Sequence, residues 1–522
     1  MNGRLMIEAT IFGTGAIAER AWNILTDFAD CEGAGGIRVV SFADNDRRRH
    51  GSRFHGRPVW SAEELARSSE SEWVVIASQW HAEIASQLRG LGMRADRLLC
   101  WNGEEDALRD ALVVEYRKQK QPVLAGGCLI DRDTLPRVLI LSHETLNESH
   151  GTGVLLKRYF EAFAPDHLFS VAHRPSGLPW LAHSLHLTDT GARAVGALRD
   201  ALEAAQFRPD LVFATALHET DLTLLQNILT IVPPGTPVVQ HFMDFVPHHE
   251  AGFLERFARV VPQLTEVWAL TEALQSMLTA RLGREVHLVT GLLQYVTRAV
   301  RTEHREFDAG FRTAMVGNFY NPRVVGFIRD VWRRCRATLP ALGPVEWYVS
   351  PGRLQGLLDG GFDPGLDFVW RGFFGGPRLL RRLAQADLGL LALNHEGAAA
   401  GNYLRYSLPS RLTEFACAGV PLFAVASPDT PLAAFIARHG VGRTATGPDI
   451  DRVANGLVQF IQSREARARA GAAGRSLAER EFRIERFRDW FNGRMLTLAR
   501  DASLASNAAG AHGSALQLSP GC

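Results

Sequence analysis

The segment that most constrains the fold of this chain is residues 406–426, YSLPSRLTEFACAGVPLFAVA. A polar loop ends at Pro409, and apolar residues at helical spacing follow from about Ser410 to Ala418. Gly419 then separates this helix from a wholly apolar run, residues 420–426. A helix that stops at a glycine and leads directly into a buried strand is typical of doubly wound α/β domains with parallel sheets.

The start of that helix predicts an anion site. Ser410 is the expected N-cap, and the free N–H groups of a helix start attract phosphate. Arg411 adds a permanent charge that can bond a diphosphate in bidentate fashion, and Glu414, one turn later, can accept hydrogen bonds from sugar hydroxyls. These residues favour a nucleotide ligand, while the alternative is an ordinary helix with a surface glutamate.

Composition limits the function classes. The 522 residues allow two to four domains, and 46% hydrophobic with 22% charged residues is typical of a soluble globular protein. A net charge of +1 gives no reason to expect nucleic acid as a partner. The six cysteines form no Cys-x-x-Cys pair, so we expect reduced thiols and no metal site. Without an apolar run of ~20 residues, we expect a cytoplasmic protein, with peripheral contact at the inner face of the membrane left open.

The first 120 residues predict a small Rossmann-like domain. Apolar runs at residues 7–12, 37–43 and 73–77 alternate with helical patterns. Gly13 and Gly15 form a glycine turn after the first run, and Asp44 ends the second, as in dinucleotide-binding units. NAD or another nucleotide could bind here; the alternative is a degenerate scaffold or an oligomerisation module. The segment 42–46 and the later Gly-x-Pro-Val of residues 56–59 resemble small Rossmann-like domains found beside sugar-modifying enzymes.

Two more units of the same kind are expected after a linker. In one, a strand at 137–142 precedes the glycine loop of Gly151, Thr152 and Gly153, and a later strand runs into His241 and Asp244. In the other, a strand from Thr313 ends at Gly317 and Asn318, and another delivers Arg371. Open α/β sheets bind ligands at the carboxyl ends of their strands, so these residues are candidates for a site.

The segment Pro-Ser-Arg-Leu-Thr-Glu-Phe-Ala-Cys-Ala-Gly-Val-Pro, residues 409–421, resembles the donor site of GT-B glycosyltransferases of the group 1, family 4 type. The resemblance implies an α/β protein in which the Rossmann-like domain precedes a GT-B pair of two facing Rossmann-like domains. It implies donor binding by Gly317, Asn318, Arg323, Arg371, Ser410, Arg411 and Glu414, catalysis by His241 or Asp244, and an acceptor or phosphate loop at Gly151, Thr152 and Gly153.

The implied function is transfer of a sugar from a nucleotide-diphosphate sugar to a glycan, lipid-linked or other glycoconjugate acceptor, in surface polysaccharide biosynthesis. It is of hexosyltransferase type and needs no metal. Tyr406 stands where many retaining members carry a glutamate, so the stereochemical outcome stays open. His241 and Asp244 are also not adjacent, unlike the His-Asp pair of that family.

The predicted boundaries are 1–120 for the Rossmann-like domain, 121–135 for a linker, 136–308 and 309–482 for the acceptor-side and donor domains, 483–502 for a C-terminal helix that returns to the acceptor-side domain, and 503–522 for a disordered tail. Two alternatives remain. One is an NAD-dependent sugar oxidoreductase or epimerase, although the chain lacks a Tyr-x-x-x-Lys pair. The other is a non-catalytic nucleotide-binding protein.

Overall fold

The computed structural model describes most of the chain. The described residues are 6–26, 31–32, 36–68, 73–93, 97–101, 123–146, 151–174, 183–244, 252–290, 296–297, 301, 303–308, 310–317, 322–349, 354–355, 358–359, 361–372, 374, 376–393 and 405–515. They divide into two compact units. Unit 1 is Met1–Gln121 with Tyr295–Ala299, and unit 2 is Pro122–Gln294 with Val300–Cys522.

Unit 1 is the predicted Rossmann-like domain, with strand order β4-β5-β3-β1-β6-β7. Its central strand β1 pairs in parallel with β3 on one side and β6 on the other. The strands are β1 (Met6–Phe12), β3 (Gly36–Ala43), β4 (Arg53–Phe54), β5 (Arg57–Trp60), β6 (Trp73–Ala77) and β7 (Leu98–Trp101). The helices are α1 (Ala16–Thr26), α2 (Ala62–Ser68) and α3 (His81–Gly90), and β2 (Cys31–Glu32) pairs with β17 (Val296–Thr297).

Unit 2 contains two further parallel sheets, and we call residues 123–290 the N-lobe and 301–481 the C-lobe. The N-lobe sheet has the order β12-β11-β10-β13-β14-β15-β16. Its strands are β10 (Val138–Glu144), β11 (Leu168–Arg174), β12 (His183–His186), β13 (Leu211–Ala214), β14 (Val238–Phe242), β15 (Glu266–Ala269) and β16 (His287–Leu288). The helices are α5 (Gly151–Phe160), α6 (Ala192–Ala204), α7 (Glu219–Ile231), α8 (Phe253–Val260) and α9 (Glu272–Leu282).

The C-lobe sheet repeats this plan with the order β20-β19-β18-β21-β22-β23. Its strands are β18 (Thr313–Val316), β19 (Val345–Tyr348), β20 (Phe368–Gly372), β21 (Leu388–Ala392), β22 (Leu422–Val425) and β23 (Gly442–Ala445). The helices are α10 (Pro322–Thr338), α12 (Gly376–Leu383), α14 (Leu412–Cys417), α15 (Pro431–His439), α16 (Ile450–Gln462) and α17 (Arg464–Glu481). In both lobes the chain order reverses beside the first strand, so the switch points lie between β10 and β13 and between β18 and β21.

The segment 406–426 folds largely as its sequence predicts. α14 ends at a glycine with φ of +69°, where the N–H groups of Gly419 and Val420 bond the carbonyls of Ala416 and Phe415. This is a Schellman motif, which turns the chain into β22, whose residues are all buried. The N-cap prediction is wrong, however. Arg411 holds that position without a side-chain cap bond, and the carbonyl of Ser410 accepts from Thr413 instead.

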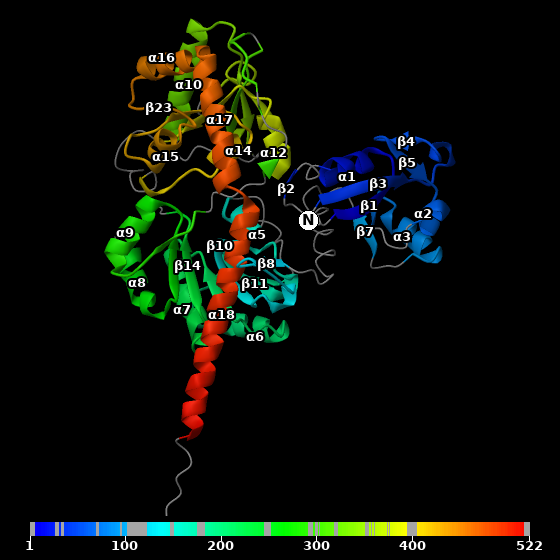
Figure 1. The fold of residues 1–522 in the computed structure, drawn as a ribbon, viewed down its shortest axis with the longest axis vertical. Coiled ribbons are helices and arrows are strands. Elements are labelled where there is room, and N and C mark those ends of the chain that lie inside the picture. The colour runs from blue at the N-terminus through cyan, green and yellow to red at the C-terminus, as the bar shows by residue number, and fades with distance from the viewer. Residues whose placement is uncertain are drawn as a thin grey trace, which may run out of the picture. The chain divides into compact units, whose positions relative to one another are not determined.

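The last helix returns to the N-lobe, as the resemblance implied. α18 (Ile484–Ala515) follows α17 and runs along the N-lobe in Figure 1. Phe491 and Met495 are fully buried there in one apolar cluster with Tyr159 and Trp268. The carbonyl of Arg158 on α5 also accepts a hydrogen bond from Arg488 at 3.0 Å. Because α18 packs on the N-lobe and α17 on the C-lobe, these helices tie the two sheets together.

Three segments differ from the boundaries predicted from the sequence or lie outside the described residues. The predicted linker contains the hairpin β8 (Val123–Ala125) and β9 (Cys128–Ile130), which packs on α18 through a bond from Gly126 N–H to the Asp489 carbonyl. α18 extends to Ala515, into the predicted tail. Residues 106–119, a charged stretch whose sequence is compatible with a helix, lie outside the described residues.

Candidate functional site

In the C-lobe, the structure brings together two predicted donor residues that are far apart in sequence. Gly317 follows β18 at the switch point, and its φ of +75° is one that side chains with a Cβ rarely adopt. A Cβ at this glycine would lie 2.9 Å from the guanidinium carbon of Arg411, so the absent side chain makes room for the arginine. Arg411 donates to the carbonyl of Val316 at 2.6 Å. A positive charge is thereby fixed at the carboxyl end of β18.

The structure describes some of the other predicted donor residues fully and others only in part or not at all. Glu414 lies in the first turn of α14, three residues after Arg411, and Ser410 is exposed just before that helix. Asn318 lies outside the described residues, and only the backbone of Arg323, in α10, is described.

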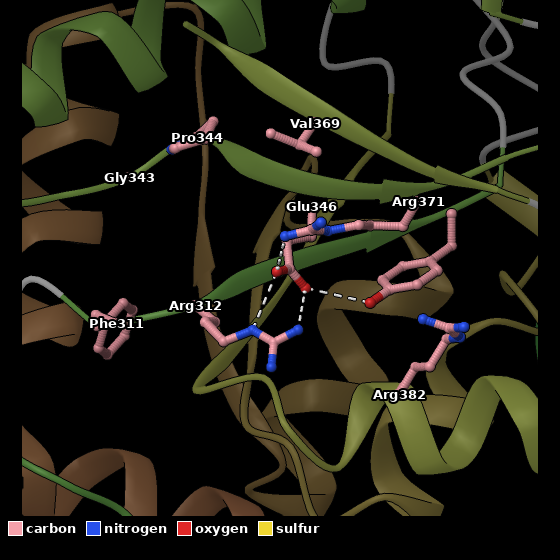
Figure 2. A pocket seen from close by; sticks show the side chains of 10 residues that line it. Phe311, Arg312, Gly343, Pro344, Glu346, Val369, Arg371 and Arg382 are labelled. Carbon is pink, nitrogen blue, oxygen red and sulfur yellow. Dashed lines mark hydrogen bonds and ion pairs between the residues drawn. The ribbon is translucent and has the colours of Figure 1, made fainter. Parts of the chain in front are cut away.

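Arg371 does not join this group through its side chain. It donates to Glu346 at 2.9 Å, on the neighbouring strand β19, in a cavity that also contains Arg312 (Figure 2). Its predicted role in donor binding is not supported by this contact.

At the N-lobe switch point the structure reveals a histidine–aspartate pair that the sequence did not single out. His143, near the end of β10, lies with its Nδ1 2.9 Å from Oδ1 of Asp221 on α7. Asp221 is fully buried, and its Oδ2 accepts from the backbone N–H groups of Leu217 and His218 at 3.0 and 2.8 Å. A carboxylate that accepts these bonds favours a proton on Nδ1, which leaves Nε2 of His143 as the basic nitrogen.

Other histidines surround this pair. The centroid of the His143 ring lies 4.0 Å from the ring centroid of His218 and 6.0 Å from that of His173. His143 and His218 both follow apolar strands, which is a signal that the sequence offered. Only the strand order, which puts β10 beside β13, makes them neighbours.

His241, the predicted catalytic histidine, lies in the N-lobe core. It is fully buried on β14, between the rings of Tyr159, Phe213 and Trp268, whose centroids are 5.8, 6.2 and 5.8 Å away. Burial lowers the pKa of His241 to about 3, with a small opposing effect from the backbone of Val289. The imidazole is therefore neutral and screened from solvent here, and its catalytic role stays a prediction.

Asp244, the second predicted catalytic residue, lies beyond the end of β14. It is half-buried, and burial raises its pKa to about 6 while the Ser407 hydroxyl opposes that rise. Ser407 belongs to the C-lobe, four residues before Arg411. Asp244 thus lies beside the segment that leads into α14.

Two more contacts join the lobes at this edge. The hydroxyl of Thr271, the N-cap of α9, donates to the carbonyl of Tyr406 at 2.6 Å. Glu272 accepts two hydrogen bonds from Arg438 at 2.8 and 2.9 Å. The carboxyl ends of β14 and β15 therefore meet the segment that leads into α14.

The glycine loop predicted at Gly151, Thr152 and Gly153 is already helical. These residues form the first turn of α5, three residues earlier than expected. The preceding residues 147–150 are outside the described part of the chain, and a role in binding acceptor or phosphate stays a prediction.

In unit 1, the predicted dinucleotide-type residues line one cavity of about 490 Å³. Gly13, Thr14, Gly15 and Asp44 contribute to it, together with Trp80, whose side chain is 60% exposed. Asp44 accepts from the hydroxyl of Thr14 and from the N–H of Asp46. A glycine turn, a carboxylate and an aromatic face fit a nucleotide, and its identity, NAD or another, remains a prediction.

The described residues contain no group of three or more histidine, cysteine or acidic residues arranged to hold a metal ion. Within the same residues, no helix is long and apolar enough to cross a membrane.

The chain is similar to several known proteins. Residues 6–99 match the family model described as C2185-like, N-terminal, and no curated protein matches the chain. Among solved structures, the chain is similar to HepE from Anabaena in complex with UDP and glucose, at 14% identity, covering 68% of this chain and 97% of that one, with a TM-score of 0.49. It is also similar to sucrose-phosphate synthase from Thermosynechococcus elongatus, at 12% identity, covering 70% and 99%, with a TM-score of 0.49. A third is WaaG, a glycosyltransferase involved in lipopolysaccharide biosynthesis, at 14% identity, covering 66% and 95%, with a TM-score of 0.43.

At these TM-scores the likeness adds nothing to what the sheets themselves establish. The predicted fold class is confirmed by the strand orders: a small Rossmann-like domain of the C2185-like type precedes two Rossmann-like lobes, the domain plan of GT-B glycosyltransferases.

Proposed function

We propose that unit 2 is a glycosyltransferase that moves a sugar from a nucleoside-diphosphate sugar to a hydroxyl of a glycan or glycoconjugate acceptor. The position of Arg411 carries the proposal: it occupies the space that a Cβ at Gly317 would fill and bonds the carbonyl of Val316. It holds a guanidinium group at the switch point of a parallel sheet, beside the start of α14, and this is where such sheets bind phosphates. Arg411 would stabilise the charge that builds on the departing diphosphate, and Glu414 would accept from the ribose hydroxyls.

On the acceptor side, we assign the general base to His143 rather than to His241. Asp221 orients His143, and Nε2 would take the proton of the acceptor hydroxyl as its oxygen attacks the anomeric carbon. The bond from that carbon to the diphosphate breaks as the new one forms, so the configuration at the carbon inverts. His241 is neutral and enclosed by aromatic rings, which suits a core residue.

The donor assignment is tested by substrate hydrolysis and transfer. The chain is incubated with UDP-, GDP-, ADP-, CDP- and dTDP-sugars, with and without EDTA, and release of the diphosphate is measured. Arg411→Gln should lower kcat/KM about 10²-fold, the usual loss when one charge-stabilising donor is removed. Arg469→Gln is the matched control, because Arg469 is exposed on α17 and pairs with Glu465 of the same helix. Equal rates for Arg411→Gln and wild type would refute the donor site, and loss of activity in EDTA would refute metal independence.

The base assignment has a separate readout. His143→Gln should lower the transfer rate by about 10² to 10⁴ while leaving the affinity for the nucleoside diphosphate within a factor of two. Asp221→Asn should also lower the transfer rate. NMR of the product gives the anomeric configuration, and retention would contradict the single displacement.

We also propose a role in surface polysaccharide assembly in the cytoplasm. The paired lobes suit a donor on one side and a large acceptor on the other. Transfer to a lipid-linked saccharide but not to a monosaccharide would support this setting.

A further inference from the structure

A second charged cavity lies in the C-lobe, on one face of the part of the sheet formed by β18, β19 and β20. It has a volume of about 490 Å³ and lies around the amino ends of β18 and β19 and one face of β19 and β20. Figure 2 shows Arg312 and Arg371 reaching toward Glu346, with Arg382 on the neighbouring helix α12. We call Arg312, Arg371, Arg382 and Glu346 the arginine pocket.

Glu346 occupies the base of the arginine pocket and is saturated with donors. Its side chain is 7% exposed and accepts from Arg312 at 3.0 and 2.8 Å, from Arg371 at 2.9 Å and from the hydroxyl of Tyr348 at 3.2 Å. Burial opposes ionisation of this carboxyl, yet Arg312 and Arg371 hold its pKa below the ordinary value. The carboxylate is therefore charged and supplies one negative charge.

The cations exceed that charge. Among the described residues that line the cavity, three arginines face one carboxylate, which leaves two positive charges in excess. Asp387 lies close by and accepts from the backbone N–H of Arg312, but Arg301 and Arg305 already pair with its carboxylate. It therefore does not neutralise the pocket.

The arginines are also held in place before any ligand arrives. Arg312 donates to Glu346 with two nitrogens and to Gln385 with a third at 2.9 Å. The guanidinium carbon of Arg382 lies 4.1 Å from the ring centre of Phe374, a cation–π contact that leaves the edges of the guanidinium able to donate. Fixed guanidinium groups bind phosphate well because their forked donors match its oxygens.

We propose that the arginine pocket binds a small molecule through a phosphate or diphosphate group. Phe311, Pro344 and Val369 add apolar wall for the remainder of that molecule. The pocket is distinct from the Arg411 site, because neither Arg411 nor Gly317 is among the described residues that line this cavity. The inference stands whether or not unit 2 transfers sugars.

The test is arginine-selective labelling of the full chain with phenylglyoxal, mapped by mass spectrometry. Pyrophosphate should slow labelling of Arg371 and Arg382 at least fivefold. Arg334 on α10 is the internal control, since it is 57% exposed and pairs with Asp451 outside the cavity. Sodium chloride at matched ionic strength should give no such protection. Equal labelling with and without pyrophosphate, or equal protection by chloride, would overturn the proposal.

Two variants separate this site from the donor site, which also takes a diphosphate. Arg382→Gln should raise the pyrophosphate concentration that protects Arg371 about tenfold, as expected for one charged hydrogen-bond donor, whereas Arg411→Gln should leave it unchanged. Glu346→Gln should lower that concentration, since it removes the competing carboxylate. Because Arg382 is exposed, its variant remains informative even where Glu346→Gln fails to fold. Protection lost on Arg411→Gln but kept on Arg382→Gln would overturn the assignment.

Vesicles identify the source of the phosphate. Phosphatidylcholine vesicles with phosphatidic acid are compared with pure phosphatidylcholine in the same labelling assay. Protection by free pyrophosphate alone supports a soluble phosphate compound, and protection by the acidic vesicles supports a lipid headgroup. Protection by neither refutes a phosphate site.

Discussion

Protonation of His241 should account for much of the acid sensitivity of the N-lobe. Its pKa is about 6.5 in an unfolded chain and about 3 in the fold, where burial excludes the charged form. A lowered folded pKa contributes stability that is complete above pH 6.5 and is lost as the pH falls toward 3. Between pH 7.5 and pH 4.5 the unfolded imidazole gains its proton while the folded one does not, which costs about 2.7 kcal/mol.

The variant His241→Leu has no imidazole to protonate, so it should not show this loss of folding stability. For a lobe of this size, about 2.7 kcal/mol corresponds to roughly 5–10 °C in melting temperature. Thermal unfolding is monitored by circular dichroism at both pH values. Between pH 7.5 and pH 4.5, the melting temperature of wild type should fall by roughly 5–10 °C more than that of the variant. His287→Gln, in the same lobe with a side chain 38% exposed, should behave as wild type.

An equal acid response in wild type and His241→Leu would refute the reasoning, because it would mean that solvent reaches the imidazole in the fold. Turnover supplies the functional half of the experiment. If the leucine variant keeps its transfer rate, His241 is a core residue. If it loses the rate but keeps the wild-type melting temperature at pH 7.5, the original prediction of a catalytic His241 is restored.

Three more outcomes follow from packing and charge. Gly419→Ala should lower the stability of unit 2 by about 1–3 kcal/mol in thermal unfolding, because its φ is +69° and a Cβ would lie 2.6 Å from the carbonyl oxygen of Arg301; an unchanged melting temperature would contradict the turn. Phe491→Ala should cost about 3–5 kcal/mol in urea unfolding, since the ring is fully buried between α18 and the N-lobe, and a loss under 1 kcal/mol would mean that α18 does not pack there. The melting temperature of Asp244→Asn should change less than that of wild type as the pH rises from 4 to 6. The raised pKa of the Asp244 carboxyl contributes stability to wild type below pH 4, and this stability is lost as the pH passes 6. A matching melting profile over that interval would show that Asp244 ionises freely.

The sequence by itself determined the order of strands and helices over most of the chain. Runs such as residues 73–77 are apolar at every position, as is typical of a strand buried on both faces, and β6 begins and ends at those residues. Gly419 marked the end of α14 because few other residues adopt its backbone angles. The repeated strand–helix alternation then required parallel sheets.

Helix starts and segments without a clear period were less well determined. Ser410 looked like an N-cap, but the chain is already in a tight turn there and the helix begins two residues later. The segment that forms the hairpin β8–β9 has the sequence pattern of a linker, because it contains Gly126 and Gly127 and shows no clear period. It is ordered by its contacts with α18 from the far end of the chain.

The composition of the site was decided by tertiary structure. His143 and Asp221 are 78 residues apart, and only the placement of β10 beside β13 brings them within hydrogen-bond distance. His241 stood at the right end of its strand, but the alternation of the pleat turns it toward Tyr159 in the core. Arg371 likewise lies near the carboxyl end of β20, yet it bonds Glu346 of the adjacent strand. Local sequence fixes where a strand ends, whereas the direction and partners of a side chain depend on neighbours supplied by distant parts of the chain.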